Sequence, residues 1–242
     1  MSLNALIAKI ADLIFPSARC LGCDEPRDLE EGACLCAECR EELESLRTLD
    51  KVCPNCQSPI KKGHPCAYCL NGGMEGLDRA YAAFLYHGLA QKLVIALKFG
   101  PIEKAAEPLS REMALQISGV RFDALVPVPL YQINERERGM NQSRVLANQI
   151  SELTGIPVLE AVKKIRRTKR QSSLGAKDRK ENVKGAFECA LNVSGMELLL
   201  IDDVRTTGST ARECAKQLRI KGAKSVCLLS ATVAGHGEKH EP

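Results

Sequence analysis

The chain has 242 residues, of which 45% are hydrophobic and 26% charged, a composition typical of a globular protein with one medium domain and one small one. Its net charge is only +4, which excludes a protein that is basic over its whole surface. No apolar run approaches the roughly eighteen residues of a membrane-spanning helix, so the sequence predicts no transmembrane segment.

The first 14 residues carry apolar side chains at helical spacing. This pattern predicts a short amphipathic helix whose apolar stripe is interrupted by Lys9 and Asp12. Such a helix either packs against its own protein or docks on a membrane surface or a partner protein. The segment lacks the basic start and the small-residue cleavage site of a signal peptide, so we expect a cytoplasmic protein.

Cysteines are concentrated near the start of the chain, where nine of the twelve lie between Cys20 and Cys69. Eight of them form four Cys-x2-Cys turns, and each such turn brings two sulfur atoms to one tetrahedral metal ion. Without an export signal, metal binding is favoured over disulfides. Eight thiolates fill two closed sites, so the sequence predicts two structural zinc ions with the ligands Cys20, Cys23, Cys36, Cys39, Cys53, Cys56, Cys66 and Cys69.

Two points about this zinc head stay open in the sequence. The four turns pair either in sequence order or interleaved. Cys34, the ninth cysteine, is an alternative to Cys36 as a ligand, although its spacing to Cys39 is less suitable. The head has little apolar material, so zinc would supply much of its folding energy. We expect an N-terminal domain, consisting of the helix and a double zinc ribbon, at residues 1–72.

From residue 73 onward, strand patterns alternate with helix patterns. Strands are expected at residues 80–86, 124–130, 197–201 and 225–231. Helices are expected at residues 90–99, 103–117, 141–153 and 209–220. The alternation predicts an α/β domain with a mainly parallel sheet over residues 73–242.

The central motif of this domain is residues 198–210, Leu-Leu-Leu-Ile-Asp-Asp-Val-Arg-Thr-Thr-Gly-Ser-Thr. An apolar strand delivers Asp202 and Asp203 at its carboxyl end, where open α/β sheets bind their ligands. Residues 206–210 then open a helix, and their N–H groups and hydroxyls suit a phosphate. The two carboxylates suit a vicinal diol or a divalent cation. Together these groups predict a ribose 5-phosphate site.

Other interpretations of the motif carry less weight. Two acids and a capping threonine also fit a plain strand–helix junction. A strand that ends in two aspartates resembles the second motif of a P-loop NTPase, but the chain has no G-x-x-x-x-G-K-[ST] loop. A G-x-G-x-x-G dinucleotide loop is absent as well.

Residues 198–210 resemble the diphosphate-sugar signature of type I phosphoribosyltransferases. Further segments are similar to the ComF family, which is named for a role in natural competence; they are residues 126–130, 136–142, 171–174, 179, 182 and 185–187. That family also joins a zinc head to a phosphoribosyltransferase domain, so the resemblance covers nearly the whole chain. Two positions depart from it: Met140 stands where an aromatic residue is expected, and Arg205 where members often have a hydrophobic residue.

The resemblance implies a type I phosphoribosyltransferase-like fold that binds 5-phosphoribosyl-1-pyrophosphate (PRPP) with magnesium. The phosphoribosyl group would be bound by Asp202, Asp203, Thr206, Thr207, Gly208, Ser209 and Thr210. Pyrophosphate or the closing loop would be contacted by Arg136, Arg138, Asn141, Gln142, Gln171 and Asn182. If the protein transfers the sugar, as a glycosyltransferase, its catalytic residues would be Arg138, Arg179, Asp202 and Asp203.

Some proteins with this signature bind the phosphorylated sugar without transferring it, and the sequence shows no acceptor site. Lys98 is a candidate on the acceptor side, but an exposed lysine on a helix is the favoured interpretation.

The segment from Lys163 to Lys184 holds ten basic and two acidic residues, a local net charge of +8. In type I enzymes a mobile loop occupies this position. The charge also suits single-stranded DNA, and the resemblance to competence proteins favours DNA and the competence machinery as partners. Aromatic residues, which would stack on bases, are only 4% of the chain. The sequence leaves three interpretations of this segment open. It is a loop that closes over the site, part of a non-enzymatic DNA-binding module that reuses the sugar-phosphate site, or a solvated loop.

Overall fold

The computed structural model describes residues 19–27, 29, 33–48, 52–60, 63–99, 103–131, 139–168 and 181–234. Several sequence-based predictions lie outside these residues. They are the N-terminal helix, the middle of the basic segment, and the candidate site residues Arg136, Arg138, Gln171 and Arg179.

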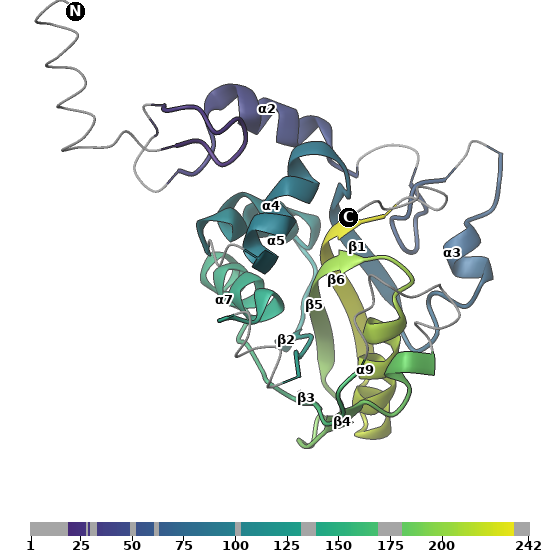
Figure 1. Ribbon diagram of the computed structural model, residues 1–242. Helices are drawn as coiled ribbons and strands as arrows, with labels where there is room; N and C mark the ends of the chain where they lie inside the picture. Colours follow the sequence, from purple (N-terminus) through teal and green to yellow (C-terminus); the bar gives the residue numbers. More distant parts are fainter. Residues whose placement is uncertain are drawn as a thin grey trace, which may run out of the picture.

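The centre of the molecule is a four-stranded parallel sheet with the strand order β1-β6-β5-β2 (Figure 1). Its strands are β1 (Arg79–Leu85), β2 (Ala124–Pro127), β5 (Glu197–Arg205) and β6 (Ser225–Val233). Every pairing within this sheet is parallel. The mainly parallel α/β sheet that the alternation of patterns predicts is therefore confirmed.

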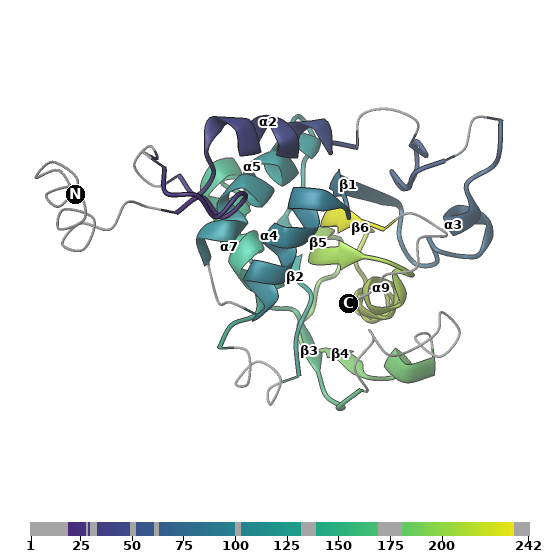
Figure 2. The ribbon, with the colours of Figure 1, turned by 45° about the horizontal axis from the view of Figure 1, so that its top comes forward.

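Helices cover both faces of the sheet (Figures 1 and 2). One face is covered by α4 (Gly88–Phe99), the short 3-10 helix η1 (Glu103–Ala105), α5 (Ala106–Gln116) and α7 (Gln142–Thr154). The other face is covered by α9 (Ser209–Ile220). Alternate side chains of a strand point to opposite faces, so β5 serves both layers. Leu199 and Ile201 pack into the first layer, and Leu198 and Leu200 into the second.

Local signals in the sequence set the two ends of α7. The Asn141 side chain caps the N-terminus by accepting a hydrogen bond from the Ser143 N–H at 3.1 Å. Gly155 ends the helix in the left-handed region, with φ of +74°. The helix predicted at residues 141–153 is confirmed.

β5 is longer than its sequence pattern predicts. The apolar run ends at Ile201, but the strand continues to Arg205 because β6 pairs with it as far as Val233. Asp202 and Asp203 therefore lie within the last residues of the strand and not in the loop after it. Their backbone is held by sheet hydrogen bonds, which makes the position of the two carboxyl groups well defined.

The basic segment 163–184 begins in β3 (Val162–Lys164), and β3 pairs antiparallel with β4 (Phe187–Cys189), which follows the end of the segment. The Arg166 guanidinium donates to the carbonyl oxygens of Asn182 and Lys184 at 3.2 and 2.8 Å. The Gly185 N–H donates to the Glu213 carboxylate of α9 at 3.0 Å. These bonds attach the base of the segment to the helix that follows the central motif.

The cysteine-rich part of the chain packs against both layers of the sheet domain. The helix α2 (Ala37–Ser45) and the first four-cysteine group pack with α4 and α5. The short helix α3 (Ala67–Leu70) and the second group pack with α9. In Figures 1 and 2, α2 lies over α4 and α5, whereas α3 lies on the other side of β1.

Candidate functional site

The eight predicted zinc ligands form two clusters, and within each cluster the sulfur atoms all lie within 4.8 Å of one another. One cluster is Cys20, Cys23, Cys36 and Cys39, and the other is Cys53, Cys56, Cys66 and Cys69. In the second cluster the Sγ atoms of Cys53 and Cys69 are 3.7 Å apart, and those of Cys56 and Cys66 are 3.5 Å apart. Zn–S bonds of about 2.3 Å in a tetrahedron separate sulfurs by about 3.8 Å, so both clusters fit structural zinc.

These distances also settle the pairing of the turns. Each cluster joins two consecutive Cys-x2-Cys turns, so the pairing follows sequence order. Cys34 stays outside its neighbouring cluster and is buried among apolar side chains. Burial raises the pKa of the Cys34 thiol to about 11, as expected of a thiol packed among apolar side chains. Cys36, and not Cys34, is therefore the cysteine that completes this cluster.

The end of β5 brings the two aspartates of the central motif together with side chains from α4 and α7. The Nζ of Lys98 lies 3.2 Å from Oδ2 of Asp203, and both side chains are largely buried. The Ser143 hydroxyl donates to Oδ1 of Asp202 at 3.4 Å. Lys98 is therefore part of the site, and the interpretation as an exposed helix lysine is wrong. No motif marks this contact, because Lys98 comes from a helix more than a hundred residues earlier in the chain.

Asp202 is the carboxyl group whose protonation the site perturbs most. Burial, followed by the charge of Asp203, raises its pKa to about 7. Lys98 and the hydrogen bonds from Ser143 and the Asp203 N–H act in the opposite direction. Two adjacent carboxylates in a partly buried site repel each other, so a hydroxyl donor or a cation would stabilise the ionised pair.

Residues 206–210, which we call the phosphate loop, run from the end of β5 into α9. With Asp202 and Val204 they line one small cavity of about 30 Å³. The Oγ1 of Thr207 and the Oγ of Ser209 are 2.9 Å apart. Gly208 stands at the N-cap of α9 with φ of +66°, a conformation that favours glycine. The loop therefore collects hydroxyl groups at the N-terminus of a twelve-residue helix.

Arg212 is a basic residue of this region that no sequence motif identifies. Its guanidinium donates to the Thr207 carbonyl oxygen at 3.0 Å and to the Ser209 hydroxyl at 3.2 Å. It also donates to the carbonyl oxygen of Gly72, just after the second cysteine cluster, at 3.3 Å. The sequence indicates a role for Arg212 at this site only through its position in the first turn of α9.

Two of the described pyrophosphate candidates, Asn141 and Gln142, lie at the start of α7 near the end of β5, and their side chains already contact the protein. Asn141 is buried and donates to the Val128 carbonyl oxygen at 3.2 Å, besides capping α7. Gln142 is buried and donates to the Leu97 carbonyl oxygen at 3.3 Å, next to Lys98. Asn182 lies at the base of the basic segment. Ligand contacts by these three residues stay predictions.

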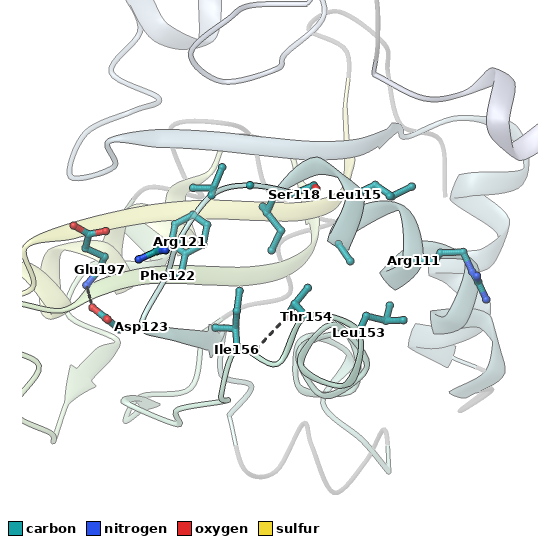
Figure 3. Close-up of a pocket in the computed structure, with 14 residues that line it drawn as sticks. Arg111, Leu115, Ser118, Arg121, Phe122, Asp123, Leu153, Thr154, Ile156 and Glu197 are labelled. Atoms are coloured by element: carbon teal, nitrogen blue, oxygen red, sulfur yellow. Dashed lines mark hydrogen bonds between the residues drawn. The ribbon is translucent and has the colours of Figure 1, made fainter.

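A second and wider cavity, of about 680 Å³, lies elsewhere in the described part of the chain. It opens at the amino edge of the sheet, between the ends of α5 and α7, as Figure 3 shows. Asp123, just before β2, and Glu197, the first residue of β5, are on its wall. The motif residues Asp202 and Asp203 are at the opposite end of β5, so this cavity is separate from the site described above.

Comparison with known proteins finds one family model and several relatives of this chain. The family model for a double zinc ribbon domain matches residues 10–70. The DNA utilization protein YhgH of Escherichia coli K12 is 34% identical over 201 residues, which are 79% of this chain and 87% of the relative. Competence protein F of Haemophilus influenzae is 30% identical over 224 residues, 88% of this chain and 95% of the relative.

More distant similarities were also found. Competence protein ComFC of Bacillus subtilis is 27% identical over 217 residues, 78% of this chain and 85% of the relative. Among solved structures, a purine phosphoribosyltransferase from Pyrococcus horikoshii is 12% identical, with a TM-score of 0.34 over 55% of this chain and 89% of that chain.

The fold and the cysteine clusters define the class: a double zinc ribbon packed on a mainly parallel α/β sheet. Within this class, the similarity to the competence and DNA utilization proteins over most of the chain shows that it belongs to the ComF family. Of the helices in the described ranges, none has the length and apolar character that a membrane span requires.

Proposed function

We propose that the chain binds PRPP, or a closely related ribose 5-phosphate, at the carboxyl end of β5. The observation that carries this proposal is the cavity lined jointly by Asp202 and the phosphate loop. The loop offers N–H groups and hydroxyls at a helix N-terminus, which suit the 5-phosphate. Asp202 and Asp203 would accept hydrogen bonds from the ribose hydroxyls, and the loop residues Thr206, Thr207, Gly208, Ser209 and Thr210 would bind the phosphate.

Magnesium is proposed as the companion of the pyrophosphate group. Among the described residues, the groups of side chains that could hold a metal ion are the two cysteine clusters, whose sulfur ligands do not suit Mg²⁺. We therefore expect no site in which protein ligands alone surround Mg²⁺. Mg²⁺ commonly binds through substrate phosphates and one or two carboxylates. Asp202 and Asp203 would supply those carboxylates, and bound Mg²⁺ would neutralise charge on the pyrophosphate.

If the ribosyl group is transferred, positive charge develops on the sugar and negative charge on the departing pyrophosphate. The family resemblance assigns the contacts with pyrophosphate to Arg136 and Arg138, and Arg179 to a loop that closes over the site. The acidic pair would then lie beside the positively charged ribose. Transfer of the ribosyl group is thus the reaction that we propose for this site if the protein is a phosphoribosyltransferase.

The test is calorimetric titration of the full-length protein with PRPP and Mg²⁺. We expect saturable binding that disappears in the double variant Asp202→Asn, Asp203→Asn. The control carries Glu103→Gln and Glu152→Gln, which remove two exposed carboxylates on other elements. Equal affinity of the wild type and the aspartate variant, with both folded, would contradict the site.

A second candidate function is binding of single-stranded DNA, which the names of the relatives favour. Lys163 and Arg167 are exposed at the base of the basic segment, where a phosphate backbone can reach them. Binding through such residues would be mainly electrostatic and would weaken with salt. Fluorescence anisotropy with a labelled oligonucleotide, with and without PRPP, tests it and shows whether both ligands use one site.

A further inference from the structure

Arg205, the last residue of β5, is buried against the second zinc ribbon. It is 1% exposed and stands immediately before the phosphate loop. Its guanidinium donates to the Ser58 hydroxyl at 3.2 Å and to the Cys56 carbonyl oxygen. It also stacks on the Tyr68 ring, with its central carbon 4.7 Å from the ring centroid. All three partners belong to the second ribbon.

The charge of Arg205 has a natural counterpart in this ribbon. A guanidinium stays protonated in proteins, and burying a charge is costly unless an opposite charge is near. Among the residues that the structure describes, no carboxylate forms an ion pair with Arg205. Four thiolates outweigh the charge of one Zn²⁺, so a filled cysteine cluster is anionic. Zinc in the second cluster would therefore place a negative centre beside the buried cation.

Tyr68 makes a second connection between this ribbon and the loop. It lies between the zinc ligands Cys66 and Cys69 in α3 and is buried. Its hydroxyl abuts Gly208 so closely that a Cβ atom at position 208 would clash with it. The same tyrosine ring thus touches Arg205 on one side of the phosphate loop and Gly208 within the loop.

We propose that Arg205 is a positioning residue that couples zinc binding in the second ribbon to the shape of the phosphate loop. Filling of the Cys53, Cys56, Cys66 and Cys69 cluster holds Tyr68 and the Cys56 carbonyl in place. These groups hold Arg205 and Gly208, and thereby the anion-binding loop between them. The consequence for ligand affinity rests on the proposed function, whereas the coupling itself does not.

The first experiment compares loss of zinc from each ribbon separately. Cys66→Ser disables the second cluster, and Cys23→Ser is the matched control in the first cluster. Each variant should retain one zinc per chain. We expect hydrogen–deuterium exchange of residues 206–210 to rise at least about fivefold in Cys66→Ser and to stay at the wild-type rate in Cys23→Ser. PRPP affinity should fall by about tenfold in Cys66→Ser alone.

The outcomes separate the two proposals. Wild-type protein that fails to bind PRPP overturns the proposed function, while the exchange rates still decide the coupling. Equal loop exchange in both cysteine variants overturns the coupling, whatever the ligand result.

A second set of variants covers the case in which Cys66→Ser does not fold. Arg205→Met removes the charge at similar length, and Arg219→Met is its control at the far end of α9, where the arginine binds Asp78. We expect faster release of one zinc to a chelator and faster loop exchange in Arg205→Met, and partial rescue of zinc retention by Arg205→Lys. Wild-type zinc release and loop exchange in a folded Arg205→Met protein would overturn the proposal.

Discussion

The ammonium group of Lys98 lies 3.2 Å from the Asp203 carboxylate and joins the end of α4 to the end of β5. Gln142 strengthens this junction, because its side chain binds the backbone of the neighbouring Leu97. A cation is therefore held in a site that otherwise presents two carboxyl groups. It stabilises the ionised acidic pair and lies where an anionic ligand would approach.

Replacing Lys98 tests whether this cation takes part in ligand binding. We expect Lys98→Met to weaken binding of PRPP with Mg²⁺ by about tenfold, the scale of one lost hydrogen bond to a charged group. Lys92→Met is the control, since Lys92 lies on the same helix but binds the backbone of Gly22 in the first ribbon. Calorimetry of both variants measures the effect. Equal affinities would show that Lys98 only supports the fold.

The raised pKa of Asp202 predicts a pH-dependent stability. In the folded protein the Asp202 carboxyl keeps its proton up to about pH 7, whereas in the unfolded chain it releases the proton near pH 3.8. The contribution of this proton to the stability of the folded protein is therefore complete below pH 3.8. It is lost as the pH rises to about 7. Asp202→Asn carries no charge at any pH. Its Tm should therefore exceed that of the wild type by more at about pH 8 than at about pH 5. Thermal unfolding at both pH values measures this, and an equal difference at the two values would contradict it.

The role of the basic segment in DNA binding is tested by replacing basic residues other than the two whose hydrogen bonds stabilise the base of the segment. Arg166 bonds the end of the segment and Lys164 bonds Thr168, so both are left unchanged. Replacing Lys163, Arg167, Lys169 and Arg170 with Gln should weaken single-stranded DNA binding and reduce its salt slope by up to about 3.

The control for this experiment replaces four exposed basic residues elsewhere with Gln: Arg111, Arg121, Lys216 and Lys224. Fluorescence anisotropy over a range of salt concentrations gives both slopes. If the two variants lose affinity equally, the segment contributes only to the overall charge.

Removal of zinc should expose an edge of the sheet. β1 is an edge strand, and its free side is covered by segments next to the cysteine clusters. The Ala80 N–H donates to the Asn55 carbonyl oxygen at 3.0 Å, and the Leu85 N–H to the Leu46 carbonyl oxygen at 2.9 Å. Unpaired edges promote association between chains. We expect a chelator to lower the Tm and to cause aggregation that light scattering detects and that added zinc prevents. Metal-free protein that stays monomeric would contradict this.

The zinc clusters and the phosphate loop were accessible to sequence analysis because their residues are close neighbours in the chain. Each Cys-x2-Cys turn places two sulfurs by local geometry alone. Likewise, the sequence from Leu198 to Thr210 is one continuous strand, loop and helix N-terminus. Even here the structure differs from the predicted strand, because pairing with β6 extends β5 beyond its apolar residues.

Contacts between distant parts of the chain were decided by the tertiary structure. The spacing of the turns allowed sequential or interleaved pairing, and only the positions of the sulfur atoms distinguish them. The sequence favours an exposed position for Lys98 on its helix, whereas in the structure the packing of α4 brings Lys98 to Asp203. Arg205 stands at a position where family members often have a hydrophobic residue, and its side chain is buried in this protein as well. It can be buried because the second ribbon supplies the Tyr68 ring, the Ser58 hydroxyl and the Cys56 carbonyl oxygen as partners. Local patterns specify the chemical groups in one segment, but which groups meet depends on how layers far apart in sequence pack together.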